Sequence, residues 1–292
     1  MSYVPALVAL YEICPYIRNF QLNNETIRVA VEDYLEGGEK KDAIIKKYGK
    51  MEDWNTSEVT DMSCLFKDVA YYTTYNHSII SEFNEDISKW DTSKVTNMEE
   101  MFRGANKFNQ PIGEWDTSSV TNVHFMFWGA KSFNHPIGNW DVSSVTTMDQ
   151  MFGFAESFNQ PIGEWDVSKV TTMCVMFGNA ESFNQDISGW NVSKVTNMEE
   201  MFAAAISFNQ SIGEWDVSKV TSMNTMFSNA KSFNQYIGDW DVSSVTDMNF
   251  MFQQTEDFNQ YIRDWDVSKV TTMDFMFEDA ESFNLENAPW YH

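Results

Sequence analysis

The chain has 292 residues, of which 43% are hydrophobic and 15% aromatic, so it can bury a sizeable core. It carries 19 basic and 43 acidic side chains, which give a formal net charge of −24 at pH 7. Such a charge repels DNA, RNA and anionic membranes, which argues against nucleic-acid binding and favours a basic protein partner.

Residues 1–50 are predicted to form a helical N-terminal cap. Helical patterns cover residues 24–35 and 40–48, with two glycines between them and Gly49 after the second. This part of the chain has seven basic and seven acidic side chains, so the whole negative charge falls on residues 51–292.

The apolar stretch 1–22 precedes these helices. It lacks a basic start and a small-residue cleavage site, and Pro5, Glu12 and Pro15 interrupt it, which argues against a signal peptide. It is also too short for a membrane span. Either it belongs to the cap or it forms a separate docking segment. The missing leader favours an intracellular or particle-associated protein over a secreted one.

Tryptophan recurs along the rest of the chain with a fixed period. From Trp90 to Trp290 one tryptophan follows another every 25 residues. Trp54 precedes Trp90 by 36 residues, so one repeat carries an insertion of 11 residues near residues 69–80. A period in this range is typical of a solenoid, here covering residues 51–292, in which each turn buries the apolar face of its neighbour.

Each turn is predicted to contain one short strand and one short helix. In the turn FNQPIGEWDVSKVTTMCVMFGNAE, which begins at Phe158, Ile-x-x-Trp-x-Val has the spacing of a leucine-rich-repeat strand. The Met-x-x-Met-Phe-x-x-Ala that follows matches one face of a helix, and Thr96 and Glu99 fit a capping box at its start. The predicted fold class is therefore an α/β solenoid, a leucine-rich-repeat-like array.

The recurring side chains are interpreted as structural. Trp, Phe, Met and Ile at fixed spacing predict a core, with the tryptophan pointing inward. The asparagine after each Phe, from Asn84 to Asn284, is expected to form an inward ladder of amides that satisfies buried backbone groups.

The unit W-D-V-S-x-V-T-x-M-x-x-M-F-x-x-A-x-S-F-N-Q-x-I-G resembles the 25-residue repeat of mycoplasma lipoprotein-associated proteins and BspA-like surface proteins. The resemblance covers about Met51 to Trp290. It implies a leucine-rich-repeat-like fold and an association with surfaces, adhesion or protein binding, with no common ligand and no catalytic residues. The chain lacks the lipid-attachment cysteine after a leader and the C-terminal anchor of secreted members.

Carboxylates recur beside the tryptophans. The two residues that flank the inward tryptophan point outward on the predicted strand and are mostly acidic. Stacked turn on turn, they form an acidic strip, broken at Gly189 and Asn191, that is a candidate surface for a basic protein. The strip consists of Glu114, Asp116, Glu164, Asp166, Glu214, Asp216, Asp239, Asp241, Asp264 and Asp266.

The strip has other interpretations. The aspartate after each tryptophan begins an Asp-x-Ser sequence, which commonly bonds to local backbone amides, so this column has a structural alternative. Repulsion between stacked carboxylates would be offset by lysines bending over the strip or by calcium. No glycine-rich calcium-binding nonapeptide occurs, so no metal is assigned. The lysines are Lys94, Lys169, Lys194, Lys219 and Lys269.

No catalytic residue and no cofactor are assigned. The four histidines share no repeat position, and the three cysteines have neither disulfide nor zinc spacing. Phosphate-binding and nucleophile motifs are missing from the sequence.

Aromatic residues enter variable columns near the C-terminus. Tyr236 and Tyr261 take a position that earlier turns give to proline, and Phe250 and Phe275 take a position held by Glu100. Together with Arg263, they either cover the end of the solenoid or form a docking patch, for a partner or for self-association.

Two functional classes follow from the sequence. The first is a non-enzymatic scaffold that holds a protein on its acidic face and aromatic end, inside a cell or in a larger particle. The second is a surface-exposed adhesin that binds a host or extracellular ligand. The missing leader favours the first class, and the family resemblance favours the second.

Overall fold

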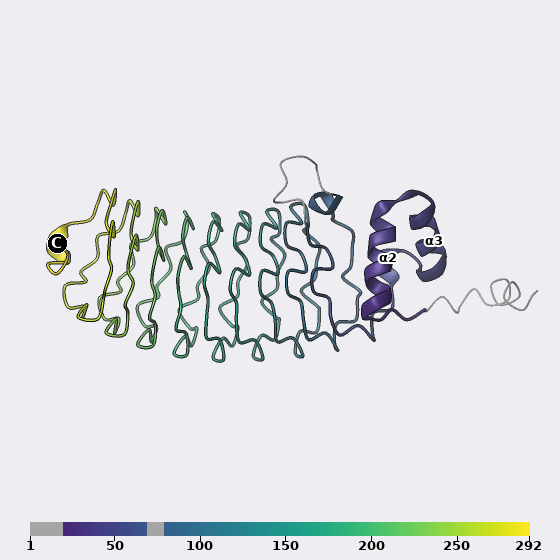
Figure 1. Cartoon of the computed structure of the whole chain (residues 1–292), viewed down its shortest axis with the longest axis horizontal. Coiled ribbons are helices and arrows are strands. Elements are labelled where there is room, and N and C mark those ends of the chain that lie inside the picture. The colour runs from purple at the N-terminus through teal and green to yellow at the C-terminus, as the bar shows by residue number, and fades with distance from the viewer. Residues whose placement is uncertain (1–19, 69–78) are drawn as a thin grey trace, which may run out of the picture.

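Two helices occupy one end of the molecule, and a long stack of coils extends away from them (Figure 1). The structure is a computed structural model that describes residues 20–68 and 79–292. The suggested docking segment 1–22 and the insertion near 69–80 therefore lie mostly outside the described residues. Each coil corresponds to one 25-residue repeat.

The helices α2 (Asn24–Glu36) and α3 (Gly38–Tyr48) lie where the sequence predicts them. The side chain of Asn23 caps α2 by accepting hydrogen bonds from the backbone amides of Glu25 and Thr26. Gly37 separates the two helices with a φ of 83°, which glycine adopts without strain.

Helix α2 covers the first coil. The Tyr34 ring meets Trp54 edge-on, with ring centroids 5.8 Å apart. The Arg28 guanidinium donates a hydrogen bond of 2.6 Å to the carbonyl oxygen of Ser63 and lies 3.3 Å from the Asp61 carboxylate. These contacts close the interior of the first coil and bind part of its outward-facing backbone.

The predicted α/β solenoid of leucine-rich-repeat type is wrong. Across the described parts of the coils, residues 51–68 and 79–292, neither an α-helix nor a strand of several residues occurs. Helical geometry there is limited to the 3-10 segments η1 (Met51–Asp53), η3 (Ile79–Glu82) and η4 (Leu285–Asn287). Parallel β-bridges join single residues of adjacent coils, for example Thr172 to Asn197.

Tight turns take the place of the predicted strand. The Trp165 amide donates to the Ile162 carbonyl at 3.2 Å, and the Val170 amide donates to the Val167 carbonyl at 2.9 Å. The expected inward residues are nevertheless confirmed, because Trp165 and Val167 are buried. Burial therefore follows the repeat although the backbone is not extended.

Left-handed residues take the place of the predicted helix. The Met and Phe side chains of the helical pattern are buried, as predicted, but Gln150 and Phe154 have φ values of 59° and 58°. A right-handed helix cannot continue through such residues. The Met151 amide instead donates to the Met148 carbonyl, three residues back, at 3.2 Å. Successive turns thus imitate the spacing of a helix face.

The predicted capping box is also absent. The Thr96 hydroxyl donates to the Thr60 carbonyl of the preceding coil at 3.2 Å, and the Glu99 amide donates to the Asn97 side chain at 3.1 Å. Both residues stabilise turns and stacking and begin no helix.

Backbone hydrogen bonds join neighbouring coils in both directions. In one ladder, the amides of alternate residues donate to carbonyls of the next coil at 2.7–3.1 Å; the pairs are Met173–Asn197, Val175–Glu199, Phe177–Met201 and Asn179–Ala203. In another, the amide of Thr171 donates to the carbonyl of Thr146 in the preceding coil at 2.9 Å. Stacking therefore satisfies backbone groups that burial would otherwise leave unpaired.

The asparagine ladder exists but lies at the surface, so the expectation that it points inward is wrong. The Asn134 amide donates to the side-chain oxygen of Asn109 at 2.9 Å, and the Gln160 side chain donates to Asn134 at 2.9 Å. Asn109 is half-buried and Asn134 is exposed.

Aromatic rings stack through the interior of the coils. Trp115 and Trp140 lie 6.5 Å apart with an interplanar angle of 1°, and Phe152 and Phe177 lie 5.7 Å apart at 4°. The Trp140 indole N–H donates to the carbonyl oxygen of Ile112 in the preceding coil at 3.1 Å. Each tryptophan thus fills the core and also pairs its polar group.

Candidate functional site

The acidic residue before each tryptophan lies within a turn. Gly163 and Glu164 connect Ile162 to Trp165, and a Cβ atom at Gly163 would come within 2.6 Å of the Asp186 carbonyl oxygen. Glycine lies close to the next coil here, although Ser188 holds the same position of the turn one coil on, and Glu164 takes the exposed position. The equivalent residues are also exposed; they are Glu114, Glu214, Asp239 and Asp264.

The aspartate after each tryptophan is exposed, but its carboxylate is engaged locally. Asp166 accepts a hydrogen bond from the Ser168 amide at 3.0 Å, and Asp216 accepts one from the Ser218 hydroxyl at 2.6 Å. Hydrogen bonds from the side chain and backbone of these serines lower the pKa of both carboxyl groups. Asp116, Asp241 and Asp266 form the same turn. This column therefore stabilises the coils.

The carboxylates before the tryptophans are different. Among the described residues, no hydrogen bond or ion pair engages Glu114, Glu164, Glu214 or Asp264. Asp239 accepts a hydrogen bond from the Tyr236 hydroxyl at 3.0 Å. We call these five residues the acidic column. Four of its carboxylates are free to meet a partner.

Charges on neighbouring coils act on one another. The pKa of the Asp141 carboxyl is lowered by its Ser143 hydrogen bonds, while the carboxylates of Asp166 and Asp116 act in the opposite direction. Lys169 and Lys194 help to lower the pKa of Asp166, after its Ser168 hydrogen bonds. These interactions indicate that the outward carboxylates of neighbouring coils share a negative field, which Gly189 and Asn191 interrupt.

Lysines compensate only part of this field. Lys219 and Lys269 help to lower the pKa of Asp216 and Asp266, after the serine hydrogen bonds. Lys94 forms its ion pair with Glu58 at 2.5 Å, away from the acidic column. Within residues 20–68 and 79–292, no group of three or more His, Cys, Asp or Glu side chains is arranged to hold a metal ion.

The aromatic residues of the C-terminal turns fall into separate groups. Tyr236 and Tyr261 are 47% and 44% exposed. Phe250 and Phe275 stack with ring centroids 5.4 Å apart, and Phe275 is exposed. The Arg263 guanidinium lies 3.5 Å from the backbone oxygen of Glu286. In the part of the chain that the structure describes, no ring contact or hydrogen bond joins the tyrosines to the phenylalanines.

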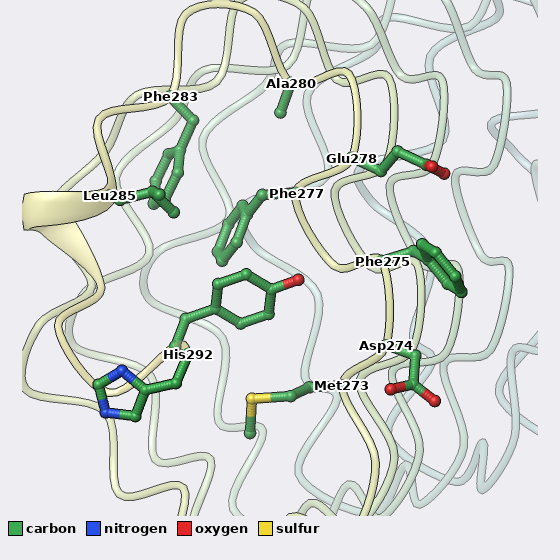
Figure 2. A pocket seen from close by; sticks show the side chains of 10 residues that line it. Met273, Asp274, Phe275, Phe277, Glu278, Ala280, Phe283, Leu285 and His292 are labelled. Carbon is green, nitrogen blue, oxygen red and sulfur yellow. The ribbon is translucent and has the colours of Figure 1, made fainter.

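An open depression of about 530 Å³ occupies the end of the stack (Figure 2). Met273 and Phe277 line it, and Tyr291 packs edge-on against Phe277 at 5.0 Å. Of the five residues predicted to form the C-terminal patch, only Phe275 lines this depression. Asp274 and Glu278 line it as well, although the sequence did not indicate them. Figure 2 shows these acidic side chains beside the apolar ones.

Sequence reasoning missed most of this depression. Met273, Phe277 and Phe283 occupy core columns, which are fully buried in interior coils. In the last coil that the structure describes they are only partly buried. Periodicity alone assigns them to the core, so it did not indicate this exposure.

Other candidates carry no site. Burial raises the pKa of the Cys174 thiol to about 12, which makes it a poor nucleophile. His124 lies 3.8 Å from the Glu99 carboxylate near the surface.

None of the helices in the described residues is long and apolar enough to cross a membrane.

One protein family matches the chain. The model of the family described as "Mycoplasma protein of unknown function, DUF285" matches residues 42–156, 135–235 and 207–292, which together extend over most of the sequence. Neither the curated proteins nor the solved structures include a match.

Proposed function

The chain belongs to this DUF285 family of repeat proteins, whose description assigns no function, and we propose that it is a non-enzymatic scaffold that binds a basic protein along its acidic column. The proposal is supported chiefly by one observation: Glu114, Glu164, Glu214 and Asp264 are exposed and have no partner among the described residues. The neighbouring aspartates, in contrast, are held by serine.

Placing carboxylates where they repel one another has a cost. The exposed like charges of Glu214, Asp239 and Asp264 lie on adjacent coils and weaken the stack slightly, and the turn itself also forms with Asn139 or Gly189 at the same position. A sequence selected for stability alone has no reason to put acids at this position. A cationic surface that spans several coils would relieve the repulsion and gain attraction at each coil that carries such an acid.

Such a surface affects chiefly the rate of association. Exposed ion pairs each contribute little affinity, but an extended negative field accelerates the encounter with a basic protein and is weakened by salt. We therefore expect a partner whose association rate falls steeply as ionic strength rises.

The test uses a 20-residue polylysine peptide as the probe and two variants of equal net charge. One variant neutralises the unpaired carboxylates, by Glu114→Gln, Glu164→Gln, Glu214→Gln and Asp264→Asn. The control neutralises four glutamates that share a different position of the repeat, by Glu156→Gln, Glu181→Gln, Glu256→Gln and Glu281→Gln. We expect association to slow about tenfold in the first variant and about twofold in the control. Equal slowing in both would mean that net charge matters and the acidic column does not.

A second candidate is a surface adhesin. It is supported by the repeat motif, which resembles the repeat of BspA-like surface proteins. The family match covers the same repeats. The two candidates differ in location, so protease treatment of intact source cells separates them. Loss of the protein to external protease favours the adhesin, and its protection favours the scaffold.

A further inference from the structure

The acidic column is uninterrupted in only one part of the stack. Asn139 and Gly189 break its earlier part, whereas Glu214, Asp239 and Asp264 follow one another on adjacent coils. The charge of the column is therefore most concentrated over these three coils. A basic protein steered by the column is drawn to this part of it.

Two of the three coils also present an exposed tyrosine. Tyr236 and Tyr261 stand three residues before Asp239 and Asp264 and are 47% and 44% exposed. Earlier coils have smaller side chains at this position, which is exposed in every coil from Pro111 onward. The exposure of the two tyrosines therefore belongs to the side of the stack, where interior coils expose the same position.

The Tyr236 ring lies against its own turn. Its hydroxyl donates to Asp239 at 3.0 Å, and a Cβ atom at Gly238 would lie 2.8 Å from the ring. Arg263 takes the place of Gly238 in the next coil. Among the described residues, the Tyr261 hydroxyl has no hydrogen-bond partner, and no lysine or arginine lies over either tyrosine ring.

The two coils place their polar groups within reach of one another. The hydrogen bond to Asp239 raises the pKa of Tyr236, and the charges of Asp264 and Tyr261 act in the same direction. Two rings and two carboxylates thus form one surface. We call Tyr236, Tyr261, Asp239 and Asp264 the tyrosine patch.

A ring beside a carboxylate holds a cation elsewhere in this molecule. The Lys41 ammonium lies 4.0 Å from the centroid of the Tyr34 ring and 3.6 Å from the Glu85 carboxylate. Attraction to the ring face and to the carboxylate adds up at such a site. The tyrosine patch has the same two kinds of group but no cation of its own in the described chain.

Where two rings are present, the cation is an arginine. The Arg103 guanidinium lies 4.7 Å from the centroid of Phe125 and 4.9 Å from that of Trp128, and it forms an ion pair with Glu100. A planar guanidinium can stack on aromatic faces while its N–H groups donate to carboxylates, whereas a lysine ammonium is a single, strongly hydrated point of charge. The two rings of the tyrosine patch therefore favour arginine.

We propose that the tyrosine patch binds an arginine side chain of the basic partner, with its guanidinium against the tyrosine rings and its N–H groups donating to Asp239 and Asp264. The inference rests on the proposed function, because it names the place where the basic protein is anchored on the acidic column. A second copy of this chain is a poor source of the arginine, since each copy has a net charge of −24.

The test measures association and dissociation rates of capped deca-arginine and deca-lysine. The variant Tyr236→Ser, Tyr261→Ser gives both positions the residue of Ser211 and leaves the net charge unchanged. Association of either peptide should therefore change by about twofold at most. Dissociation of deca-arginine should become about five to ten times faster, and that of deca-lysine about twice as fast at most.

Two further variants separate the ring from other causes. Tyr236→Phe, Tyr261→Phe keeps the rings and should keep the slow dissociation of deca-arginine. Phe250→Thr, Phe275→Thr removes two rings that do not touch the tyrosines and introduces the residue of Thr225, so it should change dissociation by about twofold at most.

Three results would overturn the proposal. They are unchanged dissociation of deca-arginine in the serine variant, equal acceleration for the two peptides, and fast dissociation from the phenylalanine variant at Tyr236 and Tyr261. Each leaves the proposed function intact, because that function is judged by the association rate when the acidic column is neutralised. Failure of the proposed function appears in that association rate, which the tyrosine variants do not alter.

Discussion

The two ends of the stack have the same core residues in different environments. In the first coil, Val59 and Met62 are completely buried, because α2 lies over them. In the last coil, the equivalent Val270 and Met273 are only partly buried. The difference shows that a coil does not complete its own core: each one needs a neighbour, which is either another coil or a helix with a matching apolar face.

Helix α2 satisfies this need in two ways. It buries Ile27, Ala30, Val31 and Tyr34 along one face, which replaces the apolar surface of a preceding coil. Arg28 also binds a carbonyl that a preceding coil would have bound. The last described coil has less cover, because only η4 and Tyr291 pack at its edge and the backbone amides of Met273 and Phe275 donate no hydrogen bond.

The largest expected contrast is between an interior tryptophan and the last one. Trp165 is buried between two coils, so Trp165→Ala should lower the free energy of unfolding by about 3–5 kcal/mol through the cavity that it leaves. Trp290 is partly exposed and stacks on Trp265 alone, so Trp290→Ala should cost about 1–2 kcal/mol. Chemical denaturation of both variants measures the difference. Equal losses would contradict the view that the C-terminal end is open.

Two tyrosines provide a matched pair at the ends. Tyr34 meets Trp54 edge-on at 5.8 Å, and Tyr291 meets Phe277 edge-on at 5.0 Å. Tyr34 is buried and Tyr291 is half-buried. Tyr34→Ala should therefore destabilise the protein by about 2–3 kcal/mol and Tyr291→Ala by about 1 kcal/mol. Thermal melting ranks the two variants, and a larger loss at Tyr291 would reverse the roles assigned to the ends.

One left-handed position of the repeat carries a branched side chain in an interior coil and a stacked ring in the last one. Val175 has a φ of 54°, which is unfavourable for a branched side chain, so Val175→Gly should stabilise the protein by about 1 kcal/mol or less. Phe275 has a φ of 56° but also stacks on Phe250 at 5.4 Å, so Phe275→Gly should have almost no net effect. Denaturant midpoints test both changes. Destabilisation by Val175→Gly would mean that its side-chain contacts outweigh the strain.

The periodicity predicted which side chains are buried, but it did not predict the backbone. Trp165, Val167 and the Met-Phe pattern are in the core as expected. The same spacing of apolar residues arises from a helix or from successive turns, and the φ values of Gln150, Phe154 and their equivalents distinguish the two. The positions equivalent to Gln150 carry Cys, Gln, Glu, Val, Thr and Phe, none of which signals a left-handed residue. Glycine and asparagine at some equivalents of Phe154 were a signal that the helix interpretation overlooked. Helix α2, in contrast, has a cap and a terminal glycine, and it was predicted.

The candidate surfaces were predicted to different extents. The exposure of Glu164 and Asp166 followed correctly from their place beside a buried tryptophan, although a turn exposes them rather than a strand. The serine bonds that distinguish the two columns were visible as the Asp-x-Ser sequence. The amides that pair with the next coil were not visible in the sequence, because they depend on a backbone path that the side-chain pattern does not encode.

The smallest predicted effect is on the pH dependence of stability, at Asp166 in a coil that lies between the two ends. Serine hydrogen bonds lower the pKa of Asp166, so its contribution to stability is present above its unfolded pKa and is lost as pH falls through the folded one. Asn191 forms the same turn with the Ser193 amide at 3.2 Å and has no charge to lose. Asp166→Asn should therefore leave the melting temperature nearly unchanged at neutral pH and reduce its fall in acid. Melting from pH 6 to pH 2, at about half-unit steps, measures this effect. An unchanged acid profile would mean that the Asp166 turn does not respond to pH.

Amide hydrogen exchange of the free protein tests the difference between the ends most directly. The first coil pairs all four of its forward amides with the next coil, at N–O distances of 2.7–2.9 Å; they belong to Met62, Cys64, Phe66 and Asp68. These four amides should be protected, as should their equivalents in interior coils. The equivalent amides of the last described coil donate no backbone hydrogen bond and should exchange within about tenfold of unstructured rates; they belong to Met273, Phe275, Phe277 and Asp279. Protection of these amides equal to that of the first coil would contradict the difference between the two coils.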